Sequence, residues 1–237
     1  MKNKKLLKEI ITVEKRYNDI FNGDRIELDQ TGRILMAPCI ECLNFIDLKS
    51  GQKILELNSN EQKSSQFVSI DDGKDECIVT FAYNSSGENL VIAYSSGLLR
   101  HYSLTFIIHD DDKIEIKHSL QRTWKSMHIG PIARIRFDMT GTLIATGGSD
   151  GTIKLWNLIQ KYCTHNFRNH IRGVIHTVTF APRFTPDSYQ LFVSGDDYGI
   201  HVWNLIDSKH LYALNGHESK VMEILFTTDQ QYFLSGS

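Results

Sequence analysis

The sequence predicts an all-β protein in which a four-stranded unit recurs along the chain, as in a β-propeller. Two segments carry this prediction: residues 153–159 and 200–206 are close copies that begin 47 residues apart, at positions 153 and 200. Each alternates apolar and polar side chains, as a half-buried strand does, and each holds a tryptophan at the same place, Trp156 and Trp203. Each also follows a polar turn that contains glycine.

The segments upstream of the two copies also match each other. Residues 143–147 correspond to 191–195, and residues 132–137 correspond to 174–180. A histidine precedes each unit, and a further strand follows each tryptophan strand. Four short strands at a period of ~40–45 residues are typical of a propeller blade. A β-sandwich is the alternative, but a sandwich does not require the same order of His, Thr or Ser, Asp and Trp in every unit.

The unit continues in both directions from these two copies. Ile46 and Tyr102 take the tryptophan place in two earlier units, and a last unit begins near Gly216. We therefore expect an incomplete propeller over residues 22–237, with four full blades plus half a fifth and the ring incomplete in this chain. The expected blades cover about 22–62, 63–119, 120–167, 168–214 and, in part, 215–237. We expect residues 1–21 to form an N-terminal extension and residues 105–118 to form an insertion or extended hairpin with a solvated acidic turn.

Composition places the chain in the ordinary globular range. Hydrophobic residues make up 41% and charged residues 23% of the 237 residues, and 26 Lys and Arg against 28 Asp and Glu give a net charge of −2. This balance supplies no global basic field that would attract nucleic acid or an anionic membrane. No stretch approaches the ~20 apolar residues of a membrane span, so no membrane partner is expected.

Cysteine usage indicates thiols in a reducing compartment. Cys39 and Cys42 form one C-x-x-C, whereas Cys77 and Cys163 stand alone. A zinc site would need a second pair at matched spacing, so we predict no metal.

The most conspicuous polar residues of one unit are His128, Thr146, Asp150 and Trp156. A Trp Nε1–H needs an acceptor when buried, and the Thr146 hydroxyl accepts from it while donating to His128. Asp150 in the turn accepts from the other imidazole nitrogen. A catalytic triad would occur once, whereas these residue types recur at the blade period. We therefore predict a structural hydrogen-bond network, formed by His128, Thr146, Asp150 and Trp156, by His170, Ser194, Asp197 and Trp203, and by His217 and Ser235.

No motif for an enzyme or a nucleotide site is present. The sequence lacks a P-loop, a dinucleotide fingerprint, a zinc-protease helix and a nucleophile elbow. We therefore predict no catalytic residues, no cofactor and no small-molecule substrate. A candidate partner face consists of basic residues expected near one rim, the alternative being scattered solvated charge: Lys125, Arg134, Arg172 and Lys220.

The order from His128 to Trp156 and from His170 to Trp203 resembles the WD40 family. More narrowly, four segments resemble WD40 proteins of the transducin beta-like type that serve in the small-subunit processome: residues 28–32, 122–128, 143–151 and 162–168. The resemblance implies a non-enzymatic nucleolar scaffold that supports small-subunit rRNA processing. It also implies two tandem seven-bladed propellers and a helical C-terminal domain. The implied partners are other WD40 proteins of the small-subunit processome, with candidate contacts to pre-rRNA or small nucleolar RNA.

A second function class stays open at this point. A signalling or ubiquitin-ligase adaptor propeller reads a peptide motif, usually through arginines on neighbouring blades aimed at one point. Only Arg134, Arg172 and Lys220 are candidates for such a cluster, and no F-box-like helix precedes the repeats.

Overall fold

The structure is a computed structural model that describes residues 25–59, 76–84, 89–168, 171, 173–182 and 189–237. The expected N-terminal extension, residues 1–21, lies outside the described residues. His170 and Arg172, two of the predicted site residues, also lie outside them.

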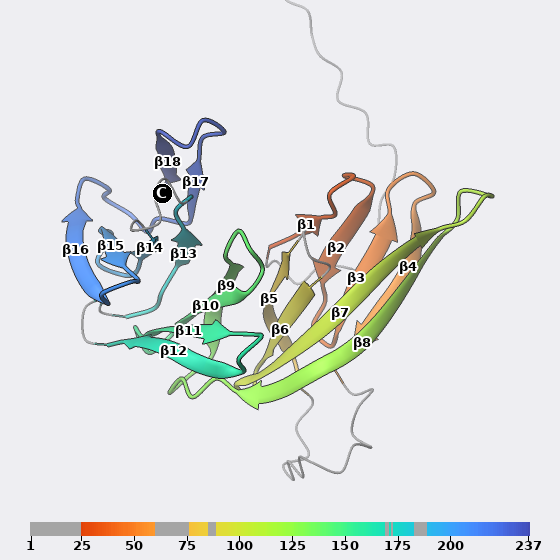
Figure 1. Ribbon diagram of the computed structural model, residues 1–237, viewed down its shortest axis with the longest axis horizontal. Helices are drawn as coiled ribbons and strands as arrows, with labels where there is room; N and C mark the ends of the chain where they lie inside the picture. Colours follow the sequence, from red (N-terminus) through yellow and green to blue (C-terminus); the bar gives the residue numbers. More distant parts are fainter. Residues whose placement is uncertain (1–24, 60–75, 85–88, 169–170, 172, 183–188) are drawn as a thin grey trace, which may run out of the picture.

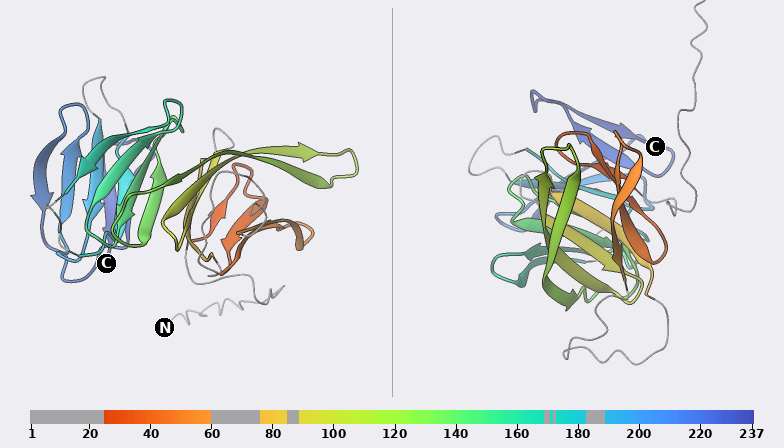
Figure 2. Two further views of the ribbon diagram at one scale, coloured as in Figure 1. Left: turned by 90° about the horizontal axis from the view of Figure 1, so that it is seen from below. Right: turned by 90° about the vertical axis from the view of Figure 1, so that its right-hand side faces the viewer.

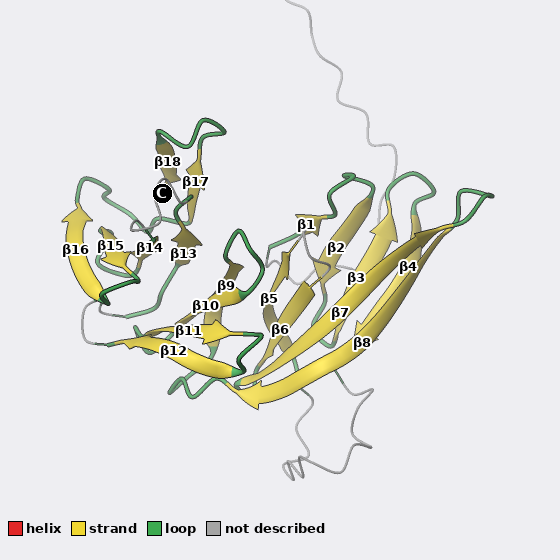
Figure 3. Ribbon diagram, in the orientation of Figure 1, coloured by secondary structure: helices red, strands yellow, loops and turns green. Residues whose placement is uncertain are grey.

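The described strands form five separate antiparallel sheets, and the strands of each sheet follow one another in sequence order (Figure 1, Figure 3). Four sheets have four strands and the last has two, which confirms the predicted all-β fold of repeated four-stranded blades. The described residues contain no helix long and apolar enough to cross a membrane.

We number the sheets as blades 1 to 5. Blade 1 consists of β1 (Glu27–Leu28), β2 (Ile34–Pro38), β3 (Cys42–Asp47) and β4 (Gln52–Asn58). Blade 2 consists of β5 (Ile78–Asn84), β6 (Asn89–Tyr94), β7 (Leu98–Ile108) and β8 (Ile114–Lys125). Blade 3 consists of β9 (Ile132–Phe137), β10 (Leu143–Gly148), β11 (Ile153–Asn157) and β12 (Tyr162–Phe167). Blade 4 consists of β13 (Thr177–Phe180), β14 (Gln190–Ser194), β15 (Ile200–Asn204) and β16 (Lys209–Leu214), and blade 5 of β17 (Glu223–Phe226) and β18 (Phe233–Gly236).

The blades are arranged side by side in an arc that does not close into a ring (Figure 1). The first strands lie on the inner side of the arc, where β5 contacts β9, β9 contacts β13, and β13 contacts β17. Each blade therefore presents its innermost strand to the same central space, as the blades of a propeller do.

A β-bulge recurs at one place in each of the first four blades. The pairing of the third strand with the fourth shifts by one residue immediately before Ile46, Tyr102, Trp156 and Trp203. All four side chains are buried. The shared register confirms that Ile46 and Tyr102 occupy the tryptophan place, and the bulge adds local twist at the same point of each blade.

Hydrophobic clusters fill the spaces between neighbouring blades. Blades 1 and 2 share one cluster, and Phe45, Phe81 and Tyr102 are among its members. Separate clusters join blade 2 to blade 3, blade 3 to blade 4, and blade 4 to blade 5. Because each sheet buries apolar side chains against its neighbours, the core is divided among the junctions between blades.

Aromatic pairs mark three of these junctions. The rings of Trp124 in blade 2 and Trp156 in blade 3 have centroids 6.0 Å apart. Phe167 in blade 3 lies 4.5 Å from Trp203 in blade 4. Phe192 in blade 4 contacts Phe226 and Phe233 of blade 5, each at 5.2 Å.

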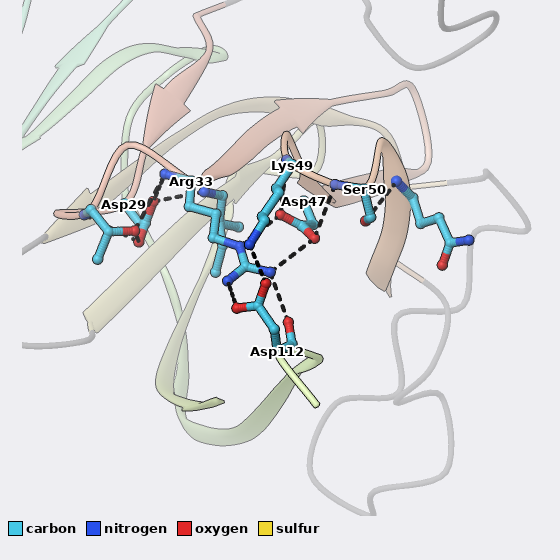
Figure 4. Close-up of polar contacts among 9 residues, drawn as sticks. Asp29, Arg33, Asp47, Lys49, Ser50 and Asp112 are labelled. Atoms are coloured by element: carbon cyan, nitrogen blue, oxygen red, sulfur yellow. Dashed lines mark hydrogen bonds and ion pairs between the residues drawn. The ribbon is translucent and has the colours of Figure 1, made fainter. Parts of the chain in front are cut away.

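Strands β7 and β8 form the extended hairpin expected at residues 105–118, and it projects beyond the shorter strands (Figure 2). The acidic turn, residues 109–113, is exposed as expected, and Asp112 in it also forms ion pairs that the sequence did not predict. Arg33 of blade 1 donates from Nη1 to Asp112 at 2.7 Å and from Nε to Asp47 at 2.9 Å, and Lys49 also contacts Asp112 (Figure 4). The Arg33 guanidinium holds the pKa of Asp47 well below its ordinary value.

The contacts of Asp112 join the hairpin to blade 1 but contribute little free energy. Asp112 is about half exposed, and exposed pairs are worth ~0–1 kcal/mol. The apolar cluster between blades 1 and 2 therefore provides most of the attachment.

We predict that Phe192→Ala lowers the free energy of unfolding by about 3–5 kcal/mol, because the side chain is buried against blade 5. Denaturant unfolding followed by tryptophan fluorescence measures the change. Leu211→Ala, at a 42% exposed position of the same blade, is the control and is expected to cost less than about 1 kcal/mol. Equal losses in the two variants would contradict the importance of the junction.

Candidate functional site

The polar residues singled out in blade 3 lie within hydrogen-bonding distance of one another. Trp156 Nε1 donates to Thr146 Oγ1 at 3.1 Å, and Thr146 Oγ1 lies 3.0 Å from His128 Nε2. On the other side of the imidazole, Nδ1 lies 3.2 Å from Asp150 Oδ1. This arrangement connects the turn before β11 to the tryptophan in that strand.

Thr152 is part of the same arrangement, and the sequence analysis missed it. Its hydroxyl lies 2.8 Å from His128 Nδ1 and donates to Asp150 Oδ1 at 2.8 Å. The signal was present, because Thr152 is two residues after Asp150 and its amide also donates to that carboxylate, as in an Asx turn.

Asp150 also binds the chain that leads into blade 3. Its Oδ2 accepts from the Ile129 amide at 2.8 Å. Burial raises the pKa of Asp150, but the hydrogen bonds from Ile129 and Thr152 and the charge of His128 outweigh it and lower the pKa to about 2.

His128 is unsuited to act as a base toward a ligand in solution. Its side chain is fully buried, and both ring nitrogens face protein oxygen atoms. Burial lowers the pKa of His128, and the Asp150 charge only partly offsets this. We propose that the network fixes the turn of blade 3 against the strand that carries Trp156.

The predicted set in blade 4 is only partly described, since His170 lies outside the described residues. Asp197 contacts His201 Nε2 at 2.7 Å. Its neighbour Asp196 accepts from the Val174 amide at 2.9 Å, the contact that Asp150 makes to Ile129 in blade 3. Ser194 and Trp203 are both buried in their strands. Asp196 was not singled out in the sequence, because Asp197 is six residues before Trp203, the same spacing as Asp150 to Trp156, whereas Asp196 is seven residues before it.

In blade 5, His217 Nε2 lies 2.7 Å from Ser235 Oγ, which repeats the contact between His128 and Thr146. Blade 2 has a different polar tie. The buried Arg100 donates to the Ser59 carbonyl at 2.7 Å and to Glu76 at 3.1 Å, and its guanidinium lies over the Tyr94 ring. Arg100 was not among the residues predicted from the sequence, because it has no counterpart in the His-Asp pattern of the later blades.

Three of the four residues of the candidate partner face lie in the described part of the chain, and the face stays a prediction. Lys125 is exposed at the end of β8, and the Arg134 guanidinium donates to the adjacent Ala133 carbonyl on β9. Lys220 pairs with Asp196 at 3.4 Å. Arg172 cannot be placed, because it is outside the described residues.

Cys39 and Cys42 flank the tight turn between β2 and β3, and the Cys39 amide donates to the Cys42 carbonyl at 2.7 Å. Burial raises the pKa of the Cys42 thiol to about 11, with smaller contributions from Glu56 and Cys39. Within the described ranges, no three His, Cys, Asp or Glu side chains are grouped to hold a metal ion.

The Asp150→Ala variant should unfold with a free energy about 2–4 kcal/mol lower than the wild type, because it leaves the Ile129 and Thr152 amides without their acceptor and removes one partner of His128. Thermal and denaturant unfolding measure this loss. Asp110→Ala, in an exposed turn, is the matched control and should change little. Wild-type stability of Asp150→Ala would refute the structural role of the network.

A second prediction concerns pH. The folded state lowers the pKa of His128 below its ordinary value of 6.5, so the unfolded chain binds the proton more readily. Stability should therefore fall as the pH drops below about 6.5, by at most about 1.4 kcal/mol per pH unit from this group. Unfolding between pH 7 and pH 5 should show a shallower slope for His128→Asn than for the wild type. The exposed His118→Asn is the control, and an unchanged slope in His128→Asn would exclude this residue as the source.

Comparison with known proteins identifies the repeat. The family described as "WD domain, G-beta repeat" matches residues 119–157, 161–204 and 208–237. These ranges fall on blades 3 to 5 and begin at the end of β8.

Curated relatives extend the similarity over most of the chain. Transducin beta-like protein 3 of Rattus norvegicus is 34% identical over 223 residues, and the human protein is 33% identical over the same length. In each case the match covers 94% of this chain but only 24% of the relative. U3 small nucleolar RNA-associated protein 13 of Saccharomyces cerevisiae is 29% identical over 167 residues, which is 69% of this chain and 17% of that protein.

A solved structure confirms the fold. A chain in the crystal structure of the mitotic checkpoint complex superposes with a TM-score of 0.66 at 15% identity, covering 89% of this chain and 56% of that chain. At this identity the likeness concerns the fold alone. Together with the matched repeats and the recurring four-stranded blades, these comparisons identify the chain as a WD40-repeat protein.

Proposed function

We propose that this chain acts as a non-enzymatic WD40 scaffold of the nucleolar small-subunit processome and supports small-subunit rRNA processing in ribosome biogenesis. The observation that carries the proposal is the similarity to transducin beta-like protein 3 over 94% of the chain. The similarity to a U3 small nucleolar RNA-associated protein points to the same process. Because the chain spans 24% of the length of the first relatives, the roles of their remaining parts are not assigned to it.

The geometry supports a binding role rather than catalysis. The residues that would compose a Ser-His-Asp-like set in blade 3 are used within the fold, since His128 is fully buried and Asp150 accepts from Ile129 and Thr152. An acid–base group must reach the proton that it transfers, and the fully buried His128 ring cannot reach a substrate in solution. The proposed partners are other WD40 proteins of the processome, with pre-rRNA or small nucleolar RNA as further candidate contacts.

Affinity purification of the tagged chain from cells tests the proposal. We expect U3 small nucleolar RNA, small-subunit rRNA precursors and other propeller proteins to be enriched over an unrelated tagged WD40 protein, and we expect the chain in the nucleolus. Enrichment of cullin components without precursor RNA would favour the adaptor class and overturn the proposal.

A further inference from the structure

A cavity of about 590 Å³ opens at the rim where blades 3 and 4 meet. It is bordered by the connection from β8 to β9, by the turn before β11, and by the chain that leads into blade 4. Its walls combine two exposed apolar residues, two cations and the turn of the hydrogen-bond network: Met127, Ile129, Asp150, Thr152, Lys154, Arg168, Ile171 and Gly173.

Lys154 supplies a cation that is almost fully buried. The residue is 3% exposed, and its ammonium donates to the Ser126 carbonyl at 3.2 Å and to the Met127 carbonyl. An ammonium has three N–H donors, and these contacts use two of them. A buried cation without a carboxylate in direct contact is costly, so an anion in the cavity would stabilise it.

Arg168 adds a second positive charge to the same cavity. Burial lowers the pKa of Lys154, Asp150 raises it, and the charge of Arg168 lowers it further, so the two cations act on each other. The Asp150 carboxylate carries one negative charge and therefore balances only one of the two cations that line the cavity with it. The cavity therefore carries an excess of positive charge.

The mouth of the cavity is apolar. Ile129 is 93% exposed and Met127 is 72% exposed, and they are separated by only one residue. The Ile129 amide is held by Asp150, so the backbone that presents these side chains is fixed. A fixed pair of exposed apolar side chains beside a cationic cavity is suited to an amphipathic ligand.

We propose that this rim cavity binds an acidic peptide segment of a partner protein. A carboxylate lies between Arg168 and Lys154, and a neighbouring apolar side chain of the peptide covers Ile129 and Met127. The inference deepens the proposed function, on which it rests for the expectation that the partners are proteins.

The composition of the cavity favours a peptide over RNA. Single-stranded RNA is usually bound by aromatic side chains that stack on its bases, and among the residues that the structure describes none that lines the cavity is aromatic. A single carboxylate with an apolar neighbour satisfies both the charge and the exposed apolar surface.

Fluorescence anisotropy with the full 237-residue chain tests the proposal. The probes are labelled decapeptides in a Gly-Ser background, each with a central Glu-Glu pair beside Leu, Ile or Phe. Matched peptides with Gln-Gln or Lys-Lys, and a labelled RNA decamer, are tested in parallel. We expect at least one acidic peptide to bind and its Gln-Gln counterpart to bind about tenfold more weakly, because a charge-assisted hydrogen bond is lost.

Two variants locate the binding and two matched variants control for charge and hydrophobicity. Arg168→Glu should weaken binding of the acidic peptide at least about tenfold and improve binding of the Lys-Lys peptide. Ile129→Ser should weaken binding of the acidic peptide several-fold. Lys161→Glu makes the same charge change, and Ile159→Ser the same apolar-to-polar change, in the exposed turn between β11 and β12. Neither control should alter binding.

Three results would overturn the proposal. They are no binding of any acidic peptide at millimolar concentration, equal weakening by Arg168→Glu and Lys161→Glu, and RNA binding that Arg168→Glu abolishes while the peptides do not bind. Circular dichroism of each variant verifies that it is folded. Because the assay uses purified protein, it can fail while U3 small nucleolar RNA still co-purifies from cells, so failure of the cavity and failure of the proposed function are distinguishable.

Discussion

The packing of each blade against its neighbours is the constraint on which the rest of the structure depends. No helix covers the described sheets, so a blade can bury its apolar faces only against the next blade. The strands of blade 5 show this directly. Ile224 faces blade 4 and is 1% exposed, whereas the next residue, Leu225, points to the other face and is 57% exposed. The face of this strand that packs against a neighbouring sheet is buried, and the opposite face is exposed.

The polar contacts act where this packing ends. Sheet-to-sheet burial fixes the middle of each strand, but the turns at the rim contain polar backbone groups that need partners. In blade 3, Asp150 accepts from the Ile129 and Thr152 amides, and in blade 2 the buried Arg100 donates to the Ser59 carbonyl. Different residues thus form the hydrogen bonds that backbone groups at the rim require, and blade 2 does so without a His-Asp pair.

The sequence was informative where a pattern recurs and uninformative where a contact depends on one blade. Alternation and the tryptophan period predicted the four-stranded blades and the positions of Ile46 and Tyr102, because the register of a sheet follows its buried face. Arg100 and the contact between Arg33 and Asp112 could not be predicted in this way. Each joins segments that are 24 or more residues apart, through side chains that occur in one blade only. Asp196 was missed because Asp197 has the same spacing to its tryptophan as Asp150, whereas in the folded turn it is Asp196 that accepts from the Val174 amide.

The distribution of charge bears on how such a protein can hold partners. Several arginines that could track a phosphate backbone are instead paired with acids: Arg33 with Asp47, Arg100 with Glu76, and Arg136 with Glu223. Non-specific nucleic-acid binding grows with the number of phosphates that cations neutralise, so paired arginines and a net charge of −2 provide little of it. Lys154 and Arg168 differ, since the described lining of the rim cavity contains these two cations and a single carboxylate, Asp150. Recognition by this chain should therefore depend on a few placed charges next to apolar surface, which is the chemistry of a protein partner.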